Sequence, residues 1–270
     1  MAAVKQFSDG IEFELSEMDI SVANLVIEMS APAKWAAINA IRHLNRSWKL
    51  RHLDPEMAVF RAITAEEESA TALFHVLKRR CYDGADKLKP RDHIQKNAVI
   101  PFFDAITRVM AKSREFLPLT EFLIDENEKP RRLVIRFLTP HPSTGEELWA
   151  YPQPPLNFSM KEVPKSGPTR TMDFSAGLEE VVSSANVKTM IDHLRTRANL
   201  RNQILYAAGQ GYPGVEGDIE RGLRDYQRNV FAILKMCLLI EPYENKQLFV
   251  QQAIYSFLRV VKALPEDFEF

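Results

Sequence analysis

Apolar side chains recur along most of this chain at intervals of three and four residues, which is the spacing of one face of an α-helix. The first helix predicted in this way runs from about Pro32 to Lys49, and proline suits its first turn. One face of this segment would carry Trp35, Ile38, Ile41 and Leu44. The pattern therefore predicts an amphipathic helix that packs against a core.

A second helix, from about Pro55 to Cys81, has an apolar stripe that is interrupted by one charged residue. Asp54, directly before the proline, is suited to begin it. The stripe consists of Phe60, Ile63, Ala70, Phe74 and Leu77. Glu67 fills the gap in this series, where the helical pattern calls for an apolar side chain. We therefore predict that Glu67 is buried.

Helical spacing continues from about Pro90 to Ser113, where Pro101 is expected to kink or divide the helix. It returns near Ser175, and in the segment from Asn186 to Ala208 the charged residue Arg201 falls inside the apolar stripe. That stripe is formed by Val187, Met190, Leu194, Ala198 and Leu205. Two further helices are predicted at about 216–240 and 244–263.

The middle of the chain has a different composition, because eight of the sixteen prolines lie between Pro130 and Pro168. Leu133–Leu138 and Leu148–Tyr151 are β-type runs separated by turn residues, and they predict a hairpin. Ile11, Phe13 and Leu15 alternate near the N-terminus and are a candidate partner for this hairpin. The predicted architecture is mainly α: a single domain over residues 1–270, built as a bundle of about six or seven helices. The β-hairpin and proline-rich insertion is expected at 130–170.

Composition restricts the possible partners. The 35 basic and 36 acidic side chains leave a net charge of −1, which argues against binding nucleic acid through bulk charge. Cys81 and Cys237, far apart in helical contexts, predict packing residues in a reducing compartment. The longest apolar run, Val230–Ile240, is interrupted and too short to span a bilayer. We therefore expect a cytoplasmic protein with no membrane partner.

Glu67 and Arg201 are the two charges that the helical pattern places in apolar stripes. A charge left alone in such a place would cost several kcal/mol, so each is expected to have a partner. The simplest hypothesis pairs them with one another. Arg197, one turn before Arg201, is the alternative partner. Such a pair would either fix the packing of two helices or orient a site between them, since buried charges are frequent at active sites.

The stretch Leu200, Arg201, Asn202, Gln203, Ile204, Leu205, Tyr206 resembles the HEPN superfamily, many of whose members are ribonucleases. The family motif is an arginine, an adjacent polar residue and a histidine a few residues later. In that chemistry the arginine and the histidine stabilise the phosphate and move a proton as the RNA 2′-hydroxyl attacks. Tyr206 stands at the histidine position, and a phenol with a pKa of about 10 is a poor proton shuttle at neutral pH.

A second stretch resembles abortive-infection proteins of the HEPN type. It comprises Ala65, Glu66, Glu67 and Glu68, followed downstream by Asp92, His93, Gln95 and Lys96. The resemblance covers about 32–113 and 175–239, and it leaves out the β insertion. It implies a defence or toxin protein, a homodimer, and a metal-independent endoribonuclease or a degenerate RNA-binding relative. The implied site residues are Arg201, Asn202, Tyr206 and Glu67.

Other chemistry has little support in the sequence. The glycines at 209–217 follow a predicted helix, so they do not form a phosphate-binding loop of the kind that precedes one. Glu68 and His75 lack the spacing of a di-iron bundle, and His193 beside Asp192 is expected on the solvent side. No metal or cofactor is predicted. The alternative function is a non-enzymatic helical module that binds or regulates a protein partner through the hairpin and Pro152–Pro168.

Overall fold

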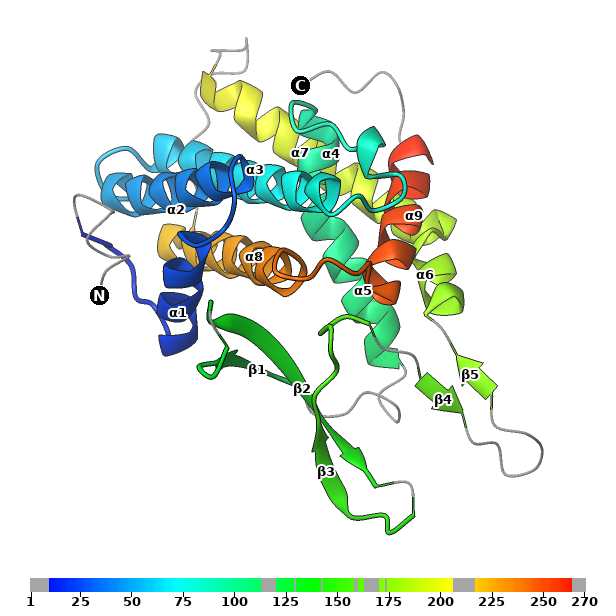
Figure 1. Cartoon of the computed structure of the whole chain (residues 1–270). Coiled ribbons are helices and arrows are strands. Elements are labelled where there is room, and N and C mark those ends of the chain that lie inside the picture. Colours follow the sequence, from blue (N-terminus) through cyan, green and yellow to red (C-terminus); the bar gives the residue numbers. More distant parts are fainter. Residues whose placement is uncertain are drawn as a thin grey trace.

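The computed structural model describes residues 10–112, 120–128, 130–141, 143–157, 160–162, 170–172, 174–205 and 217–263. The chain is mainly α-helical and carries a small antiparallel sheet on one side (Figure 1). The helices are α1 (Glu17–Val26), α2 (Ala33–Leu50), α3 (Pro55–Arg79), α4 (His93–Asn97), α5 (Val99–Lys112), α6 (Ser175–Val181), α7 (Ser184–Leu205), α8 (Ile219–Ile240) and α9 (Leu248–Ala263), with a 3₁₀ turn at Ala85–Lys87. The predicted helical fold with a hairpin insertion is confirmed.

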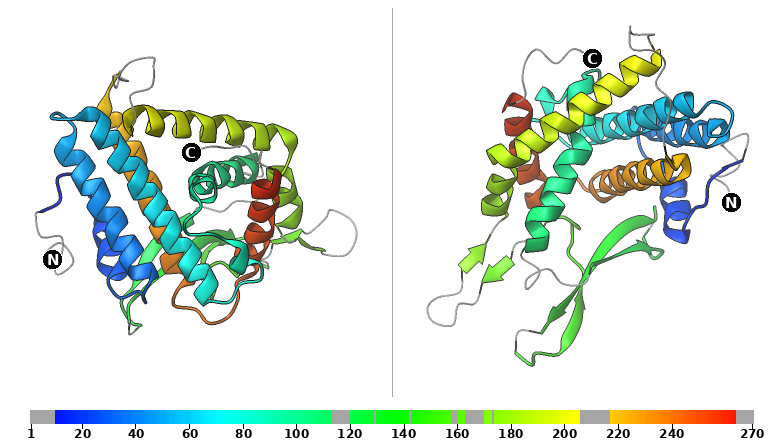
Figure 2. Two further views of the ribbon diagram at one scale, coloured as in Figure 1. Left: turned by 90° about the horizontal axis from the view of Figure 1, so that it is seen from above. Right: turned by 180° about the vertical axis from the view of Figure 1, so that it is seen from behind.

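Helices α2 and α3 lie side by side, and α8 packs against both of them (Figures 1 and 2). Asp54 begins α3 as predicted, because its side chain accepts a hydrogen bond from the Met57 amide at 3.0 Å. On α2 the predicted inner face is confirmed for Ile38, Ile41 and Leu44, which are buried. Trp35 was wrongly placed on that face: its side chain is 62% exposed and Lys34 lies over its ring.

The predicted third helix is divided into α4 and α5, and the division falls at Ala98. Pro101 lies one turn further on. Because proline has no N–H, the Asn97 carbonyl cannot receive the helical hydrogen bond that residue 101 would donate. The break therefore lies at the N-terminal side of the proline, and it leaves α4 as a short helix capped by Asp92, whose side chain accepts from the Gln95 amide at 3.1 Å.

The three-stranded sheet contains β1 (Thr120–Asp125), β2 (Arg132–Pro140) and β3 (Glu147–Ala150), in the order β1-β2-β3 with antiparallel pairs. The predicted hairpin is β2–β3. The predicted pairing with the N-terminal segment is wrong, because β1 occupies that edge of β2. Instead Phe13 is buried against Trp48 of α2, with ring centroids 6.2 Å apart. A second small sheet pairs β4 (Met160–Glu162) with β5 (Arg170–Met172), and the sequence did not predict it.

Helix α7 runs obliquely across α3 and α5 on the side opposite the three-stranded sheet (Figures 1 and 2). Its predicted stripe is buried at Val187, Met190 and Leu194. Helix α3 therefore has neighbours on several sides: α2 and α8 along its length, and α4 and α7 near its middle. That placement explains how polar residues in the centre of α3 become enclosed.

Candidate functional site: a buried polar cluster between α3, α4 and α7

Two consecutive glutamates in the middle of α3 are buried, Glu66 at 2% and Glu67 at 4% exposure. Successive helical residues are 100° apart, so neighbouring side chains point to different sides of a helix. Both can be enclosed here because separate elements cover the two directions. The predicted burial of Glu67 is confirmed, whereas the burial of Glu66 was not predicted.

Glu67 is bound by three side chains from α4. His93 Nδ1 lies 2.8 Å from Glu67 Oε2, Lys96 Nζ lies 3.3 Å from the same oxygen, and Asn97 Nδ2 donates to Oε1 at 2.8 Å. Three donors from one short helix converge on it because residues 93, 96 and 97 lie three or four positions apart and share a face. The carboxylate therefore ties the start of α4 to the centre of α3.

Glu66 is bound by Arg197 of α7 in a two-pronged ion pair. Arg197 Nη1 donates to Oε1 at 2.5 Å and Nη2 donates to Oε2 at 2.9 Å, which is the forked geometry that favours arginine over lysine. Asn229 of α8 also donates to Glu66 Oε2, at 3.3 Å, and the Arg197 guanidinium lies 5.0 Å from the centre of the Tyr226 ring. This pair joins α3, α7 and α8.

Asn97 connects the two carboxylates. Its amide nitrogen donates to Glu67, and its amide oxygen accepts from Arg197 Nη1 at 3.4 Å. One side chain thus satisfies a carboxylate on one side and a guanidinium on the other. We call Glu66, Glu67, His93, Lys96, Asn97 and Arg197 the polar cluster.

The neighbours of Glu67 in the polar cluster keep its carboxylate charged. Burial by itself raises the pKa of Glu67, but the hydrogen bond from His93, the positive charges of Lys96 and His93 and the hydrogen bond from Asn97 outweigh it and lower that pKa to about 2. Burial lowers the pKa of Arg197, and the charge of Glu66 more than compensates, so the pKa is raised. Two carboxylates of the polar cluster thus each contact a basic residue, Lys96 or Arg197.

The structure places the predicted site residues unequally. Glu67 belongs to the polar cluster. Arg201 and Asn202 lie in α7, one turn beyond Arg197, but their side chains are outside the described part, as is the whole of Tyr206. The Glu67–Arg201 pair therefore stays a prediction. The alternative, in which Arg197 binds Glu67, is wrong in its acceptor: Arg197 binds the neighbouring Glu66.

Sequence reasoning missed several members of this region. His93 and Lys96 were noted only through the resemblance, and Asn97 was not noted at all. His193, expected on the solvent side, is half-buried, and burial with the positive charge of Arg197 lowers its pKa to about 4. The burial of Glu66 could have been suspected from the run of three glutamates at 66–68, because elements that cover one buried acidic residue can also cover its neighbour.

Within the part of the chain that the structure describes, no group of three or more His, Cys, Asp or Glu side chains is arranged to hold a metal ion. None of the described helices is long and apolar enough to cross a membrane.

Both cysteines are free thiols: Cys237 is buried as predicted, but Cys81 is exposed and so is not a packing residue.

Comparison with family models, with curated proteins and with solved structures finds no match for this chain. The polar cluster therefore has to be interpreted from its own chemistry.

Proposed function

We propose that this protein is a HEPN-like helical protein of the defence or toxin type that acts on RNA at the polar cluster and the adjoining end of α7. The observation that carries the proposal is that side-chain contacts join three elements, α3, α4 and α7, and that each of them carries residues of the resemblance. Residues 65–68 of α3 and 92–96 at α4 carry the resemblance to abortive-infection proteins, and α7 contains Arg201 and Asn202. Glu67–His93 and Glu66–Arg197 contacts join these elements, although they are far apart in the sequence.

His93 supplies the proton-transfer group that Tyr206 lacks. Glu67 holds its Nδ1, which fixes the orientation of the ring in the way that a carboxylate orients a general base. Any proton exchange with RNA would then run through Nε2. The His93 side chain is 36% exposed, whereas the side chain of Glu67 is 5% exposed, so the ring links the buried carboxylate to the surface.

The proposed roles of the basic residues differ because some of them are buried against carboxylates. Arg197 and Lys96 are buried and bind carboxylates, so they organise the polar cluster and do not bind phosphate. Arg201, one turn further along α7, is the proposed phosphate-binding residue, and Asn202 is its polar neighbour. In the proposed reaction the 2′-hydroxyl attacks the adjacent phosphorus, the bond to the 5′-oxygen breaks, and a 2′,3′-cyclic phosphate and a 5′-hydroxyl are formed. Protons move from the attacking to the leaving oxygen through His93.

The test is to incubate purified protein with total RNA and to analyse the ends of the products. We expect fragments with cyclic phosphate and 5′-hydroxyl ends, and a loss of at least about 100-fold in rate for His93→Gln and for Arg201→Ala. Arg195→Ala is the matched control, because Arg195 is an exposed arginine of the same helix, and we expect it to cleave as the unchanged protein does.

A degenerate relative would give a different result in the same experiment. It would leave RNA intact, yet retain RNA in a gel-shift assay, and Arg201→Ala would weaken that binding while Arg195→Ala would not. If the protein neither cleaves nor retains RNA, or if Arg201→Ala equals the unchanged protein in both assays, the proposal is wrong. The resemblance also implies a homodimer, which light scattering on the same preparation would detect.

The alternative function, a non-enzymatic module that binds a protein partner, is favoured by the hairpin. The β2–β3 arm extends away from the helices (Figure 1), and Leu148 and Tyr151 at this arm are 45% and 52% exposed. Exposed apolar and aromatic side chains on a projecting element suit a protein contact. The two functions separate experimentally, because Leu148→Ser with Tyr151→Ser would abolish partner capture and leave RNA cleavage unchanged.

A further inference from the structure

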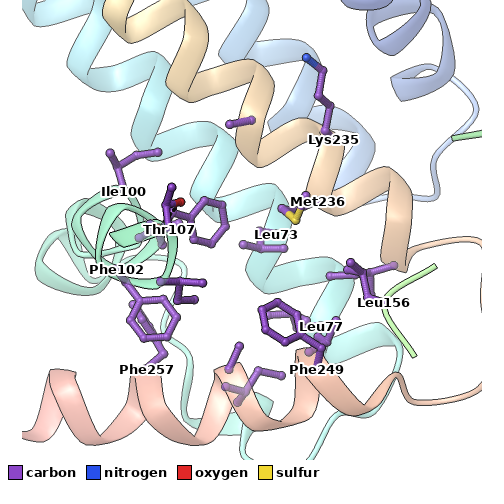
Figure 3. Close-up of a pocket in the computed structure, with 18 of the residues that line it drawn as sticks. Leu73, Leu77, Ile100, Phe102, Thr107, Leu156, Lys235, Met236, Phe249 and Phe257 are labelled. Atoms are coloured by element: carbon purple, nitrogen blue, oxygen red, sulfur yellow. Dashed lines mark hydrogen bonds between the residues drawn. The ribbon is translucent and has the colours of Figure 1, made fainter. Parts of the chain in front are cut away.

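A cavity of about 570 Å³ lies between α3, α5, α8 and α9, beside the polar cluster but separate from its buried charges (Figure 3). Its size falls within the range of about 300–1,000 Å³ that is typical of small-molecule sites.

Apolar side chains form nearly the whole wall. All of the lining residues are apolar except Asp104, Thr107, Arg228, Asn229 and Lys235. Aliphatic side chains are the more numerous, and six phenylalanine rings from several elements join them: Phe74, Phe102, Phe103, Phe122, Phe249 and Phe257. Phe257 of α9 packs edge-on against Phe102 of α5 with ring centroids 5.2 Å apart, so the wall is preformed. Such a wall selects a hydrocarbon or aromatic body.

The two basic lining residues, Lys235 and Arg228, already have partners of opposite charge. Lys235 binds Asp19 at 3.2 Å, and Figure 3 shows its side chain directed away from the centre of the cavity. Arg228 binds Asp225 at 3.2 Å. An anionic ligand would therefore have to lose its hydration without gaining a dedicated counter-ion, which is unfavourable. An uncharged ligand avoids this penalty.

One end of the cavity can form hydrogen bonds. Asn229 lies on the wall and donates its amide nitrogen to Glu66, so its side chain is held in place by the polar cluster. Asp104 lines the same cavity from α5, and burial raises the pKa of its carboxyl group, although the charges of Arg108 and Arg228 act in the opposite direction. A hydroxyl or amide group on the ligand would find both donors and acceptors here.

We propose that this cavity is a binding site for a single uncharged amphiphile, with an extended apolar body among the phenylalanine rings and one hydrogen-bonding group near Asp104 and Asn229. The site is distinct from the proposed RNA site. It therefore does not rest on the proposed function, and the two can fail independently.

The probe is a series of 1-alkanols from hexanol to dodecanol, titrated into the full chain and followed by calorimetry. Burial of one methylene contributes about 0.8 kcal/mol, so each added carbon should tighten binding by about fourfold until the cavity is full. At equal chain length, decanoate should bind at least tenfold more weakly than 1-decanol, because the two basic lining residues are already paired with carboxylates.

The variant that tests the location is Ala232→Phe, which fills the cavity from α8. We expect it to weaken 1-decanol binding at least tenfold. Ala253→Phe fills the same cavity from α9 and gives a second reading if the first variant does not fold, which circular dichroism would reveal. Ala263→Phe is the matched control on an exposed position of α9 outside the cavity, and it should bind 1-decanol as the unchanged chain does.

Three results would overturn the inference. The chain could bind no alkanol of the series; it could bind 1-decanol equally well with Phe at 232 or 253; or affinity could be independent of chain length. A fourth contrary result is a concentration-dependent dimer, seen by light scattering, that Ala232→Phe abolishes, since the cavity would then be covered by a second copy of this chain.

Discussion

The Glu67 carboxylate and the His93 imidazole lie 2.8 Å apart, from Oε2 to Nδ1, although 26 residues separate them along the chain. The contact joins the buried centre of α3 to the first turn of α4, which reaches the surface. A buried carboxylate that orients a partly exposed imidazole can serve both packing and proton transfer.

Acid should destabilise the fold through Glu67. Its pKa is about 2 in the folded chain against an ordinary value of 4.5, so the unfolded state binds the proton more readily. The resulting stability, about 3 kcal/mol, is fully present above about pH 4.5 and is lost as the pH falls through about 2. Urea unfolding between pH 7 and pH 2.5 should show this decline, and Glu67→Gln should flatten it. Parallel pH profiles for both proteins would contradict the assigned partners of Glu67.

The Glu66–Arg197 pair should behave as a coupled unit. Removing one partner leaves a buried charge without compensation, so Glu66→Gln or Arg197→Met should each lower the free energy of unfolding by about 3–5 kcal/mol. The double variant should lose clearly less than the sum of the two. A double-mutant cycle in urea measures the difference. Additive losses would mean that the two side chains do not depend on one another.

The histidine one turn before Arg197 reports on the same pair. Burial, together with the positive charge of Arg197, lowers the pKa of His193 to about 4, so its stabilising contribution is present above about pH 6.5 and is lost as the pH falls through about 4. Arg197→Met should raise that pKa toward 6.5, as followed by NMR titration of the ring protons. His43 is the internal control: its pKa is also about 4, from burial and the charges of Arg61 and Arg46, and it should not move.

Two glycine-to-alanine substitutions should change the stability of the fold in opposite directions. Gly84 has φ +82°, and a Cβ added there would lie 2.8 Å from Leu258 Cδ1, so Gly84→Ala should cost about 1–2 kcal/mol of stability. Gly222 lies in α8 with open space around it, and Gly222→Ala should stabilise the chain by about 0.5–1 kcal/mol. The melting temperature should fall for Gly84→Ala and rise for Gly222→Ala. A gain at Gly84 would show that the turn before α4 can relax to accept a side chain.

Local patterns predicted most of the helices, although not α1, because helical spacing, an N-terminal aspartate and a proline act over a few residues. Asp54 begins α3, Pro101 accounts for the break before α5, and the gap in one apolar stripe identified Glu67 as buried. These features depend on backbone hydrogen bonds and on which side of one helix is apolar. Both are local properties, and a linear pattern carries them.

Which polar groups meet depends on how the helices cross in three dimensions. Glu66 and Glu67 are adjacent in the sequence, yet one binds α7 and the other binds α4, because α3 has a different neighbour on each side. The spacing within one helix contains no information on the crossing of another, so it named the wrong acceptor for Arg197. The same holds for the apolar cavity, whose walls come from four helices, β1 and the segment around Leu156, since the apolar stripe of each helix alone looks like ordinary core. Packing between distant segments, not local periodicity, created both sites.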